Sequence, residues 1–277
     1  MARPHPQGIG IVEGRLAGAE EARFARARDI GFDAVELSFH GQDYETLPLW
    51  TEDGAVRVRR LAADAGVAIP STCATYFNRY AFASPDRAER ERCVDVLRRI
   101  VDTSAAAGLR TILLPFFANG ELQSAVQEEL AAAMVARCAA QAKAAGIRLG
   151  IEATLPADRL RAMTLLAGQD APGAVGVYYD VGNVCPAGYD VEADLQTLAD
   201  LLVGIHIKDR TLAGNAVPLG EGDVDFGAVR RGLQAAAYDG YLVLETPGPP
   251  PGAAPDAANA VNAAYLDFTR RMVDPLT

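Results

Sequence analysis

The sequence predicts an α/β protein that folds as a single closed (β/α)8 barrel. Eight short apolar, β-branched runs alternate with eight Ala-, Arg- and Glu-rich segments of helical period along 277 residues. That length fits one barrel of about 250 residues with short additions, and 50% of the residues are hydrophobic, enough for a large core. Because the eight strand–helix units recur at regular intervals, a closed barrel is favoured over an open doubly wound sheet. We therefore expect one domain that spans residues 1–277.

The elements follow one another in a simple order. The expected strands are 8–12, 33–39, 67–73, 110–116, 147–153, 175–180, 202–207 and 241–245. The expected helices lie near 18–30, 51–66, 86–107, 121–145, 157–168, 191–200, 226–237 and 256–272. Caps support these bounds: the third helix should begin at Ser84-Pro85-Asp86 with proline at its first position, and several helices end at glycine, namely Gly31, Gly66, Gly108 and Gly146.

Composition excludes several classes of protein. The net charge is −10 and the basic residues form no run longer than Arg-Arg pairs, so we expect no nucleic-acid partner. There is no GxGxxG after the first strand and no P-loop motif, which argues against a dinucleotide- or nucleotide-binding protein. No long uncharged apolar stretch or secretion signal occurs, which predicts a soluble cytoplasmic protein with no membrane partner. Four scattered cysteines are expected to be reduced core residues.

Four polar residues stand at matching places in four successive strands. Glu152, Asp180, His206 and Glu245 end the fifth to eighth runs, at intervals of 28, 26 and 39 residues. Since parallel barrel strands end at one rim, these side chains should meet there, on the inward face. Several carboxylates buried together need a compensating cation. The set therefore predicts one divalent metal ion, Mn²⁺ or Mg²⁺ first, with Co²⁺ or Zn²⁺ also compatible with three carboxylates and one imidazole.

Other polar residues near this rim are candidate substrate contacts. Lys208 follows His206 on the inward face, where it either binds a substrate oxygen or forms a structural ion pair with a rim carboxylate. Arg210 heads the long Gly/Pro-rich segment 208–226, whereas Asp209 is expected to anchor that segment. Glu36 ends the second strand, where it would orient the substrate or a ligand, or make a structural hydrogen bond.

A set of motifs resembles the xylose-isomerase-like TIM-barrel superfamily, and most of all its sugar (phosphate) isomerase/epimerase group. The motifs cover nearly the whole chain: GFDAVEL (31–37), Ser84-Pro85-Asp86 with Arg87, GIEATL (150–155), YYDVGN (178–183), GIHIKD (204–209), PLGEGDVDF (218–226) and LVLET (242–246). The resemblance implies a metal held by Glu152, Asp180, His206 and Glu245, with Glu152 and Glu245 also acting as acid and base. It further implies a small-molecule carbohydrate substrate and a homodimer or homotetramer.

One position departs from that pattern. Ketose 3-epimerases of the superfamily commonly carry a second histidine three residues after the aspartate ligand, and this chain has Asn183 there. An asparagine can hold a substrate hydroxyl but cannot shuttle a proton at neutral pH, so the departure counts against the 3-epimerase subgroup.

The predicted chemistry is metal-dependent isomerisation or epimerisation of a ketose or a related hydroxy-carbonyl compound. A cation that chelates a carbonyl and an adjacent hydroxyl eases removal of the α proton through an enediolate. Dehydration of a keto-inositol and isomerisation of hydroxypyruvate use the same step and stay open, as does a non-catalytic sugar-binding barrel. The Gly/Pro-rich segment 246–256 contains no Lys or Arg, which favours an unphosphorylated substrate.

Overall fold

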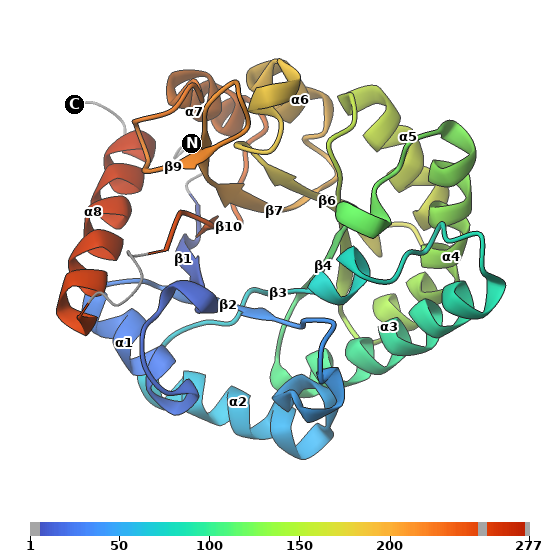
Figure 1. Ribbon diagram of the computed structural model, residues 1–277, viewed down its shortest axis with the longest axis horizontal. Helices are drawn as coiled ribbons and strands as arrows, with labels where there is room; N and C mark the ends of the chain where they lie inside the picture. Colours follow the sequence, from blue (N-terminus) through green and yellow to red (C-terminus); the bar gives the residue numbers. More distant parts are fainter. Residues whose placement is uncertain (1–5, 249–253, 275–277) are drawn as a thin grey trace. The chain divides into compact units, whose positions relative to one another are not determined.

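The eight-stranded barrel is confirmed by the computed structural model, which describes residues 6–248 and 254–274 (Figure 1). The eight barrel strands are hydrogen-bonded in the closed order β1-β10-β7-β6-β5-β4-β3-β2. Their bounds are β1 Gly8–Val12, β2 Ala34–Ser38, β3 Ser71–Cys73, β4 Thr111–Pro115, β5 Arg148–Glu152, β6 Val175–Asp180, β7 Leu202–Ile207 and β10 Tyr241–Leu244. The strands predicted at 175–180 and 202–207 have the expected bounds.

The eight α-helices lie where the sequence predicts them, with ends that shift by a few residues. They are α1 Arg23–Ile30, α2 Glu52–Ala65, α3 Arg87–Ala107, α4 Ala125–Ala144, α5 Ala157–Gly168, α6 Val191–Thr197, α7 Phe226–Ala235 and α8 Pro255–Val273. Seven short 3-10 helices accompany them in the described part of the chain, among them η1 Glu13–Arg15, which follows β1 directly.

The start of α3 differs from the prediction in one detail. Asp86 is the N-cap, and its side chain accepts a hydrogen bond from the backbone N–H of Ala88 at 2.8 Å. Pro85 therefore precedes the cap and is not the first helical residue, so that part of the prediction was wrong. The C-terminal ends of α1 and α3 are as predicted. Gly31 and Gly108 follow these helices with φ angles of 105° and 81°, which favour glycine.

The segment 208–226 is more ordered than the predicted loop. It contains a small antiparallel pair, β8 (Asp209–Arg210) and β9 (Ala216–Val217), in which Asp209 pairs with Val217. Buried Asp209 accepts hydrogen bonds from the backbone N–H groups of Gly220, Gly222 and Val224, at 2.8, 3.0 and 3.3 Å. The prediction that Asp209 anchors this segment is thereby confirmed. The companion segment 246–256 is only partly covered, because residues 249–253 lie outside the described residues.

The chain divides into two compact units, and the first consists of residues 1–36, 61–68 and 179–277. Here β10 pairs in parallel with β1 on one side and β7 on the other, with Ile11 opposite Leu244 and Leu244 opposite Ile207. The helices α6, α7, α8 and α1 follow one another as packing neighbours outside these strands (Figure 1). The expectation of one domain over 1–277 stays a prediction.

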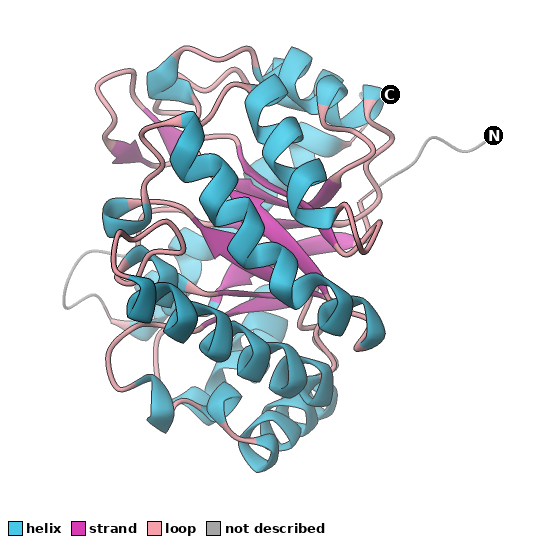
Figure 2. Cartoon of the chain, turned by 90° about the vertical axis from the view of Figure 1, so that its right-hand side faces the viewer, coloured by secondary structure: helices cyan, strands magenta, loops and turns pink. Residues whose placement is uncertain are grey.

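The second unit consists of residues 37–60 and 69–178. Its strands β3, β4 and β5 pair in parallel, with Pro115 at the end of β4 opposite Glu152 at the end of β5. The helices α3, α4 and α5 pack side by side as an outer layer (Figures 1 and 2). Aromatic rings, including those of Phe39, Tyr76 and Phe77, pack against one another at the ends of the first strands of this unit. Burial on both faces explains why these strands read as continuous apolar runs.

Two further expectations concern the whole chain. The four cysteines are free thiols, as predicted, but only Cys93 and Cys138 are buried core residues, while Cys73 and Cys185 are half-buried. Within residues 6–248 and 254–274, none of the helices has both the length and the apolar character that a bilayer crossing demands.

Candidate metal centre

The four predicted ligands converge. Glu152, Asp180, His206 and Glu245 each offer one ligand atom, and these four atoms all lie within 4.8 Å of one another. Glu152, Asp180 and His206 are buried, while the side chain of Glu245 is 30% exposed. Three carboxylates and one imidazole in so small a volume form a donor set for a hard or borderline divalent cation.

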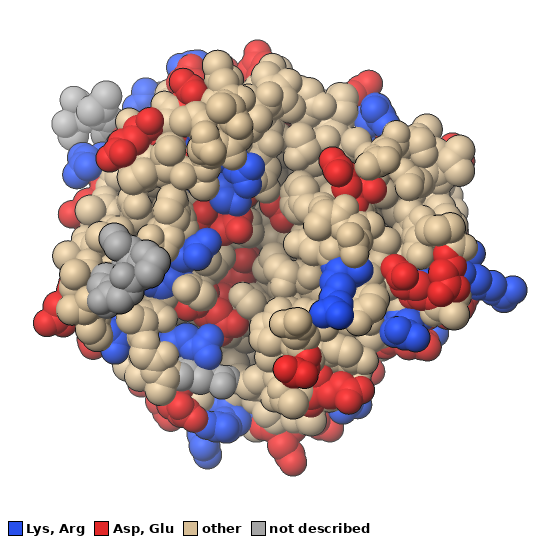
Figure 3. All heavy atoms as spheres, viewed as in Figure 1, with Lys and Arg blue, Asp and Glu red and all other residues tan. Residues whose placement is uncertain are grey.

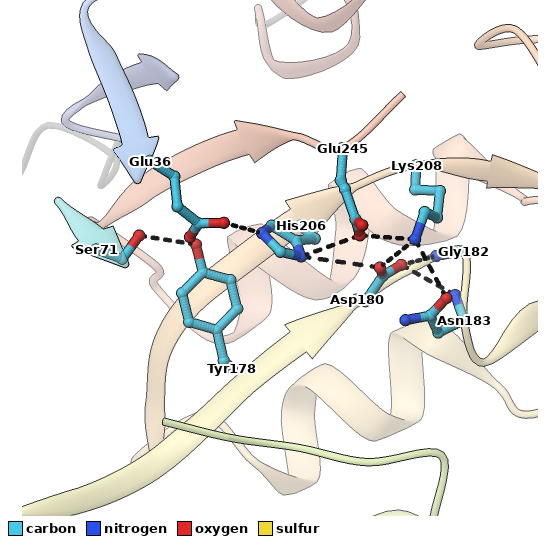
Figure 4. Close-up of polar contacts among 9 residues, drawn as sticks. All are labelled: Glu36, Ser71, Tyr178, Asp180, Gly182, Asn183, His206, Lys208 and Glu245. Atoms are coloured by element: carbon cyan, nitrogen blue, oxygen red, sulfur yellow. Dashed lines mark hydrogen bonds and ion pairs between the residues drawn. The ribbon is translucent and has the colours of Figure 1, made fainter. Parts of the chain in front are cut away.

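Local structure explains how the three ligands of the first unit are placed. Asp180 and His206 lie at or near the carboxyl ends of β6 and β7, and the Val181 N–H donates to the His206 carbonyl at 3.2 Å. Glu245 follows β10, and its N–H donates to the Ile207 carbonyl at 3.0 Å. The backbones of these strand ends are therefore tied together. Figure 4 shows the three side chains pointing toward one another.

His206 is oriented by a residue from the other end of the sequence. Its Nε2 lies 2.8 Å from Oε1 of Glu36 at the end of β2, and both side chains are essentially fully buried. Its Nδ1 then faces the ligand cluster, 3.4 Å from Glu245 Oε2 and 3.8 Å from Asp180 Oδ2 (Figure 4). A carboxylate that holds one ring nitrogen of a ligating histidine fixes which nitrogen faces the metal. Glu36 thus contacts a predicted ligand, and its predicted contact with substrate stays a prediction.

Lys208 lies directly against the cluster. Its Nζ is 2.6 Å from Glu245 Oε2, 3.2 Å from Asp180 Oδ2 and 3.4 Å from Asn183 Oδ1 (Figure 4). The chain can approach this closely because residue 182 is glycine: a Cβ there would lie 2.8 Å from Lys208 Cγ. The ion pair with rim carboxylates, one of the two roles predicted for Lys208, is therefore present. Contact with a substrate oxygen is not excluded by it and stays a prediction.

Asp180 divides its two oxygens between the backbone and the cluster. Oδ1 accepts hydrogen bonds from the N–H groups of Gly182 and Asn183 at 2.8 and 2.9 Å, and Oδ2 faces His206 and Lys208. Asn183 is placed by this turn, with its side-chain oxygen toward Lys208. The turn explains the D-x-G-N spacing in the sequence.

Burial and charge shift the proton affinities of these groups in different directions. Burial raises the pKa of Asp180, and the neighbouring Lys208 ammonium offsets this only in part. Burial also acts to raise the pKa of Glu245, but hydrogen bonds and charges from His206 and Lys208 bring it below its ordinary value. For His206, burial acts to lower the pKa, and Glu36 and Glu245 together raise it well above the ordinary value. The cluster therefore holds several mutually dependent charges in a small buried volume.

Arg210, the remaining candidate, makes hydrogen bonds within and beside the β8–β9 hairpin to which it belongs. Its Nη1 donates to the Gly214 carbonyl at 3.3 Å, and its carbonyl accepts from the Asp223 N–H at 2.8 Å. Over the strands of the first unit, acidic side chains gather in a hollow, with basic side chains at its edge (Figure 3). Substrate contact by Arg210 stays a prediction. The matching positions of the four candidate ligands in their strands allowed them to be predicted from the sequence. No feature of the sequence predicted that Glu36 pairs with His206.

The known proteins to which this chain is similar agree with one another in fold and in the kind of reaction that their names give. Residues 24–264 match the family described as xylose isomerase-like TIM barrel. The protein of Escherichia coli (strain K12) named "Putative L-ribulose-5-phosphate 3-epimerase SgbU" is 31% identical over 86% of this chain and 87% of its own length. The L-ribulose-5-phosphate 3-epimerase UlaE of Salmonella heidelberg (strain SL476) is 28% identical over 86% of each chain. Among solved structures, an L-ribulose 3-epimerase superposes with a TM-score of 0.74 at 22% identity, over 95% of this chain and 96% of that one.

Proposed function

The chain belongs to the xylose isomerase-like TIM barrel family, and from that premise we propose that it is a divalent-metal-dependent epimerase that inverts C3 of a ketose. The observation that carries this proposal is the convergence of four ligand atoms within 4.8 Å, at residues that include two glutamates. The relatives named as 3-epimerases supply the reaction type. They also outweigh the inference drawn from Asn183 against that subgroup.

The residues present fit a divalent cation. Without a positive charge, three carboxylates within such a short distance would repel one another and lose hydration on burial. One nitrogen and several oxygen donors suit Mn²⁺ or Mg²⁺ first, and Co²⁺ or Zn²⁺ are compatible with the same set. When bound, the cation would polarise the substrate carbonyl and the neighbouring hydroxyl and so acidify the intervening C–H bond.

Two glutamates supply the acid and the base. Glu152 ends β5 and Glu245 follows β10, two strands that β6 and β7 separate in the closed ring. They therefore approach the substrate from different strands. One glutamate removes the proton from C3, the C–H electron pair becomes part of a planar enediolate, and the other glutamate delivers a proton to the opposite face. The carbon centre is inverted, and the substrate and product have the same composition.

Lys208 and Asn183 complete the polar wall of this site. The Lys208 ammonium, 2.6 Å from Glu245 Oε2, helps to keep that carboxylate ionised and hence ready to accept a proton. Asn183 and Lys208 together offer the hydrogen-bond donors that a substrate hydroxyl needs. Of the two, Asn183 stands where ketose 3-epimerases commonly carry the second histidine. We assign them to binding of substrate oxygens rather than to proton transfer.

The test follows the hydrogen on C3. Metal-stripped protein is incubated in D₂O with L-ribulose or its 5-phosphate, with and without Mn²⁺, and ¹H NMR follows the signals of each carbon. We expect loss of the C3 proton signal and appearance of the C3 epimer only with metal. Glu152→Gln and Glu245→Gln should each slow this roughly 10²- to 10⁴-fold, the range for loss of a general acid or base.

The exposed Glu129→Gln on α4 is the matched control and should exchange like the parent protein. Formation of an aldose that carries deuterium at C2 would show an isomerase instead. Loss of water from a keto-inositol would show a dehydratase, and turnover of hydroxypyruvate with none of the ketoses would show a hydroxypyruvate isomerase. Ligand binding with no exchange at any carbon would show a sugar-binding barrel.

A further inference from the structure

Arg15 is a charged residue at the ligand rim that the proposed reaction does not use. It is the last residue of η1, which follows β1 without an intervening loop. In the parallel pairing of β1 with β10, Ile11 lies opposite Leu244, the residue before Glu245. The backbone of Arg15 therefore follows the strand that neighbours β10, whose end is followed by the catalytic Glu245.

The guanidinium of Arg15 has no acidic partner among the described residues, 6–248 and 254–274. Glu13, two positions earlier, forms its ion pair with Arg23 at 2.6 Å. The Nε of Arg15 is buried and has no hydrogen-bond partner in that part of the chain. Buried donors without partners are uncommon because their desolvation is not repaid. A half-buried arginine in this state is suited to an anionic ligand.

One hydrogen bond holds the backbone of Arg15 in position. The side-chain amide of Asn262, on α8, donates to the Arg15 carbonyl at 2.9 Å. The guanidinium lies along the segment that follows β10, because a Cβ on Gly248 would lie 3.5 Å from Arg15 Nη1. The connection between the eighth strand and the eighth helix is a frequent phosphate-binding place in this architecture. Here the positive charge comes from Arg15 in η1, the short helix that follows β1.

A second arginine lies on the other side of β10. Arg210 follows β7, and β7 and β1 are the two neighbours of β10 in the sheet. Its Nε is likewise buried without a hydrogen-bond partner, and it forms no ion pair among the residues that the structure describes. The two strands beside β10 are thus each followed by an arginine that forms no ion pair with a carboxylate of residues 6–248 or 254–274. Arginine binds phosphate oxygens through two parallel N–H donors.

We propose that Arg15 binds the terminal phosphate of the substrate, so that the substrate is a ketose phosphate rather than a free ketose. This inference rests on the proposed epimerase function and adds the substrate class to it. It reverses the expectation of an unphosphorylated substrate, which considered basic residues only within 246–256. The strand register brings a cation from residue 15 to that segment instead.

The test compares L-ribulose 5-phosphate with L-ribulose on the Mn²⁺-loaded protein and on Arg15→Gln. We expect the parent protein to prefer the phosphate in kcat/KM. Arg15→Gln should raise KM for the phosphate roughly 10- to 100-fold, the range for one or two charge-assisted hydrogen bonds, and leave kcat/KM for free L-ribulose unchanged. Arg28→Gln is the matched control, since Arg28 lies at the end of α1 and donates to the Gly66 carbonyl.

Equal losses on both substrates in Arg15→Gln, or no preference for the phosphate in the parent protein, would overturn the assignment of Arg15. Calorimetric titration with L-ribulose 5-phosphate separates this from the reaction itself. If neither ketose is epimerised but the parent protein binds the phosphate ester and Arg15→Gln does not, the proposed reaction fails while the phosphate site stands. If the parent protein also fails to bind it, the phosphate site fails as well.

Discussion

Two buried aspartates in the first unit, Asp180 and Asp209, use the same chemical group for different purposes. Asp209, which is fully buried, places both oxygens on backbone N–H groups of a single loop, at 2.8 to 3.3 Å. Asp180, 3% exposed, gives one oxygen to its own turn and directs the other at His206 and Lys208. Asp209 thus makes its hydrogen bonds entirely with the backbone of its loop, whereas Asp180 also interacts with charged side chains.

A functional carboxylate can therefore be recognised from its hydrogen-bond partners, without reference to relatives. An aspartate that accepts several backbone hydrogen bonds is stable as an anion with no further partner. A carboxylate that faces other carboxylates is not, and it requires a cation, from lysine or from a metal. At the ends of β6, β7 and β10, the chain offers both Lys208 and a four-atom donor set for a metal.

The largest effect is expected for Asp180→Asn. The asparagine oxygen can still accept from the N–H groups of Gly182 and Asn183, but the amide nitrogen cannot accept from the Lys208 ammonium, so the metal-free protein should lose about 1–3 kcal/mol of stability. Metal-dependent epimerisation should fall roughly 10²- to 10³-fold, because one charged ligand is lost. Steady-state kinetics and urea unfolding measure the two quantities. A variant with parental activity would contradict the assignment of Asp180 as a ligand.

Lys208→Met removes the cation that Asp180 and Glu245 share. In the metal-free protein, Asp180 and Glu245 would lose their shared ammonium partner, which should lower the free energy of unfolding by about 3 kcal/mol. Added Mn²⁺ should then stabilise this variant more than it stabilises the parent. Urea unfolding with and without metal measures this. Lys143→Met, at the only other lysine, is exposed and serves as the control; equal losses in both variants would refute the claim.

Asp209→Asn should have the smallest effect on chemistry and a moderate effect on stability. Asparagine keeps only one acceptor oxygen for the three N–H groups of Gly220, Gly222 and Val224, so we expect a loss of about 1–3 kcal/mol. Metal affinity should not change. Thermal unfolding and metal titration measure both, with the exposed Asp239→Asn as control. A variant that loses metal binding while keeping its stability would make Asp209 a functional residue instead.

Periodicity predicted most of the fold because the barrel strands are largely buried and several helices begin at a side-chain cap, such as Asp86, Asp190 and Asp225. The start of α4 was placed too early, at 121, since Ser124, which caps the helix by accepting from the Gln127 N–H, was not recognised. The β8–β9 hairpin was missed because a strand of two residues carries no alternation to detect.

The candidate site, like the fold, was predicted from the sequence only in part. Its four candidate ligands were predicted because each lies at or beside the carboxyl end of a strand, and parallel strands bring their ends to one rim. The contacts between these ligands and Glu36, Lys208 or the backbone of residue 182 depend on strand order and on close approach across the barrel. Glu36 and His206 are separated by 170 residues, and only the folded sheet brings them to 2.8 Å. Roles in substrate binding, and the predicted homodimer or homotetramer, stay predictions.

The central claim, that four side chains hold one divalent cation, is tested most directly by titrating metal-stripped protein with Mn²⁺ and following free Mn²⁺ by electron paramagnetic resonance. We predict one tightly bound Mn²⁺ per chain, no tight binding in His206→Ala, and affinity weakened roughly 10- to 100-fold in Glu36→Gln, which loses only the orienting partner. Binding of no Mn²⁺ by the parent protein, or equal binding by His206→Ala, would contradict it.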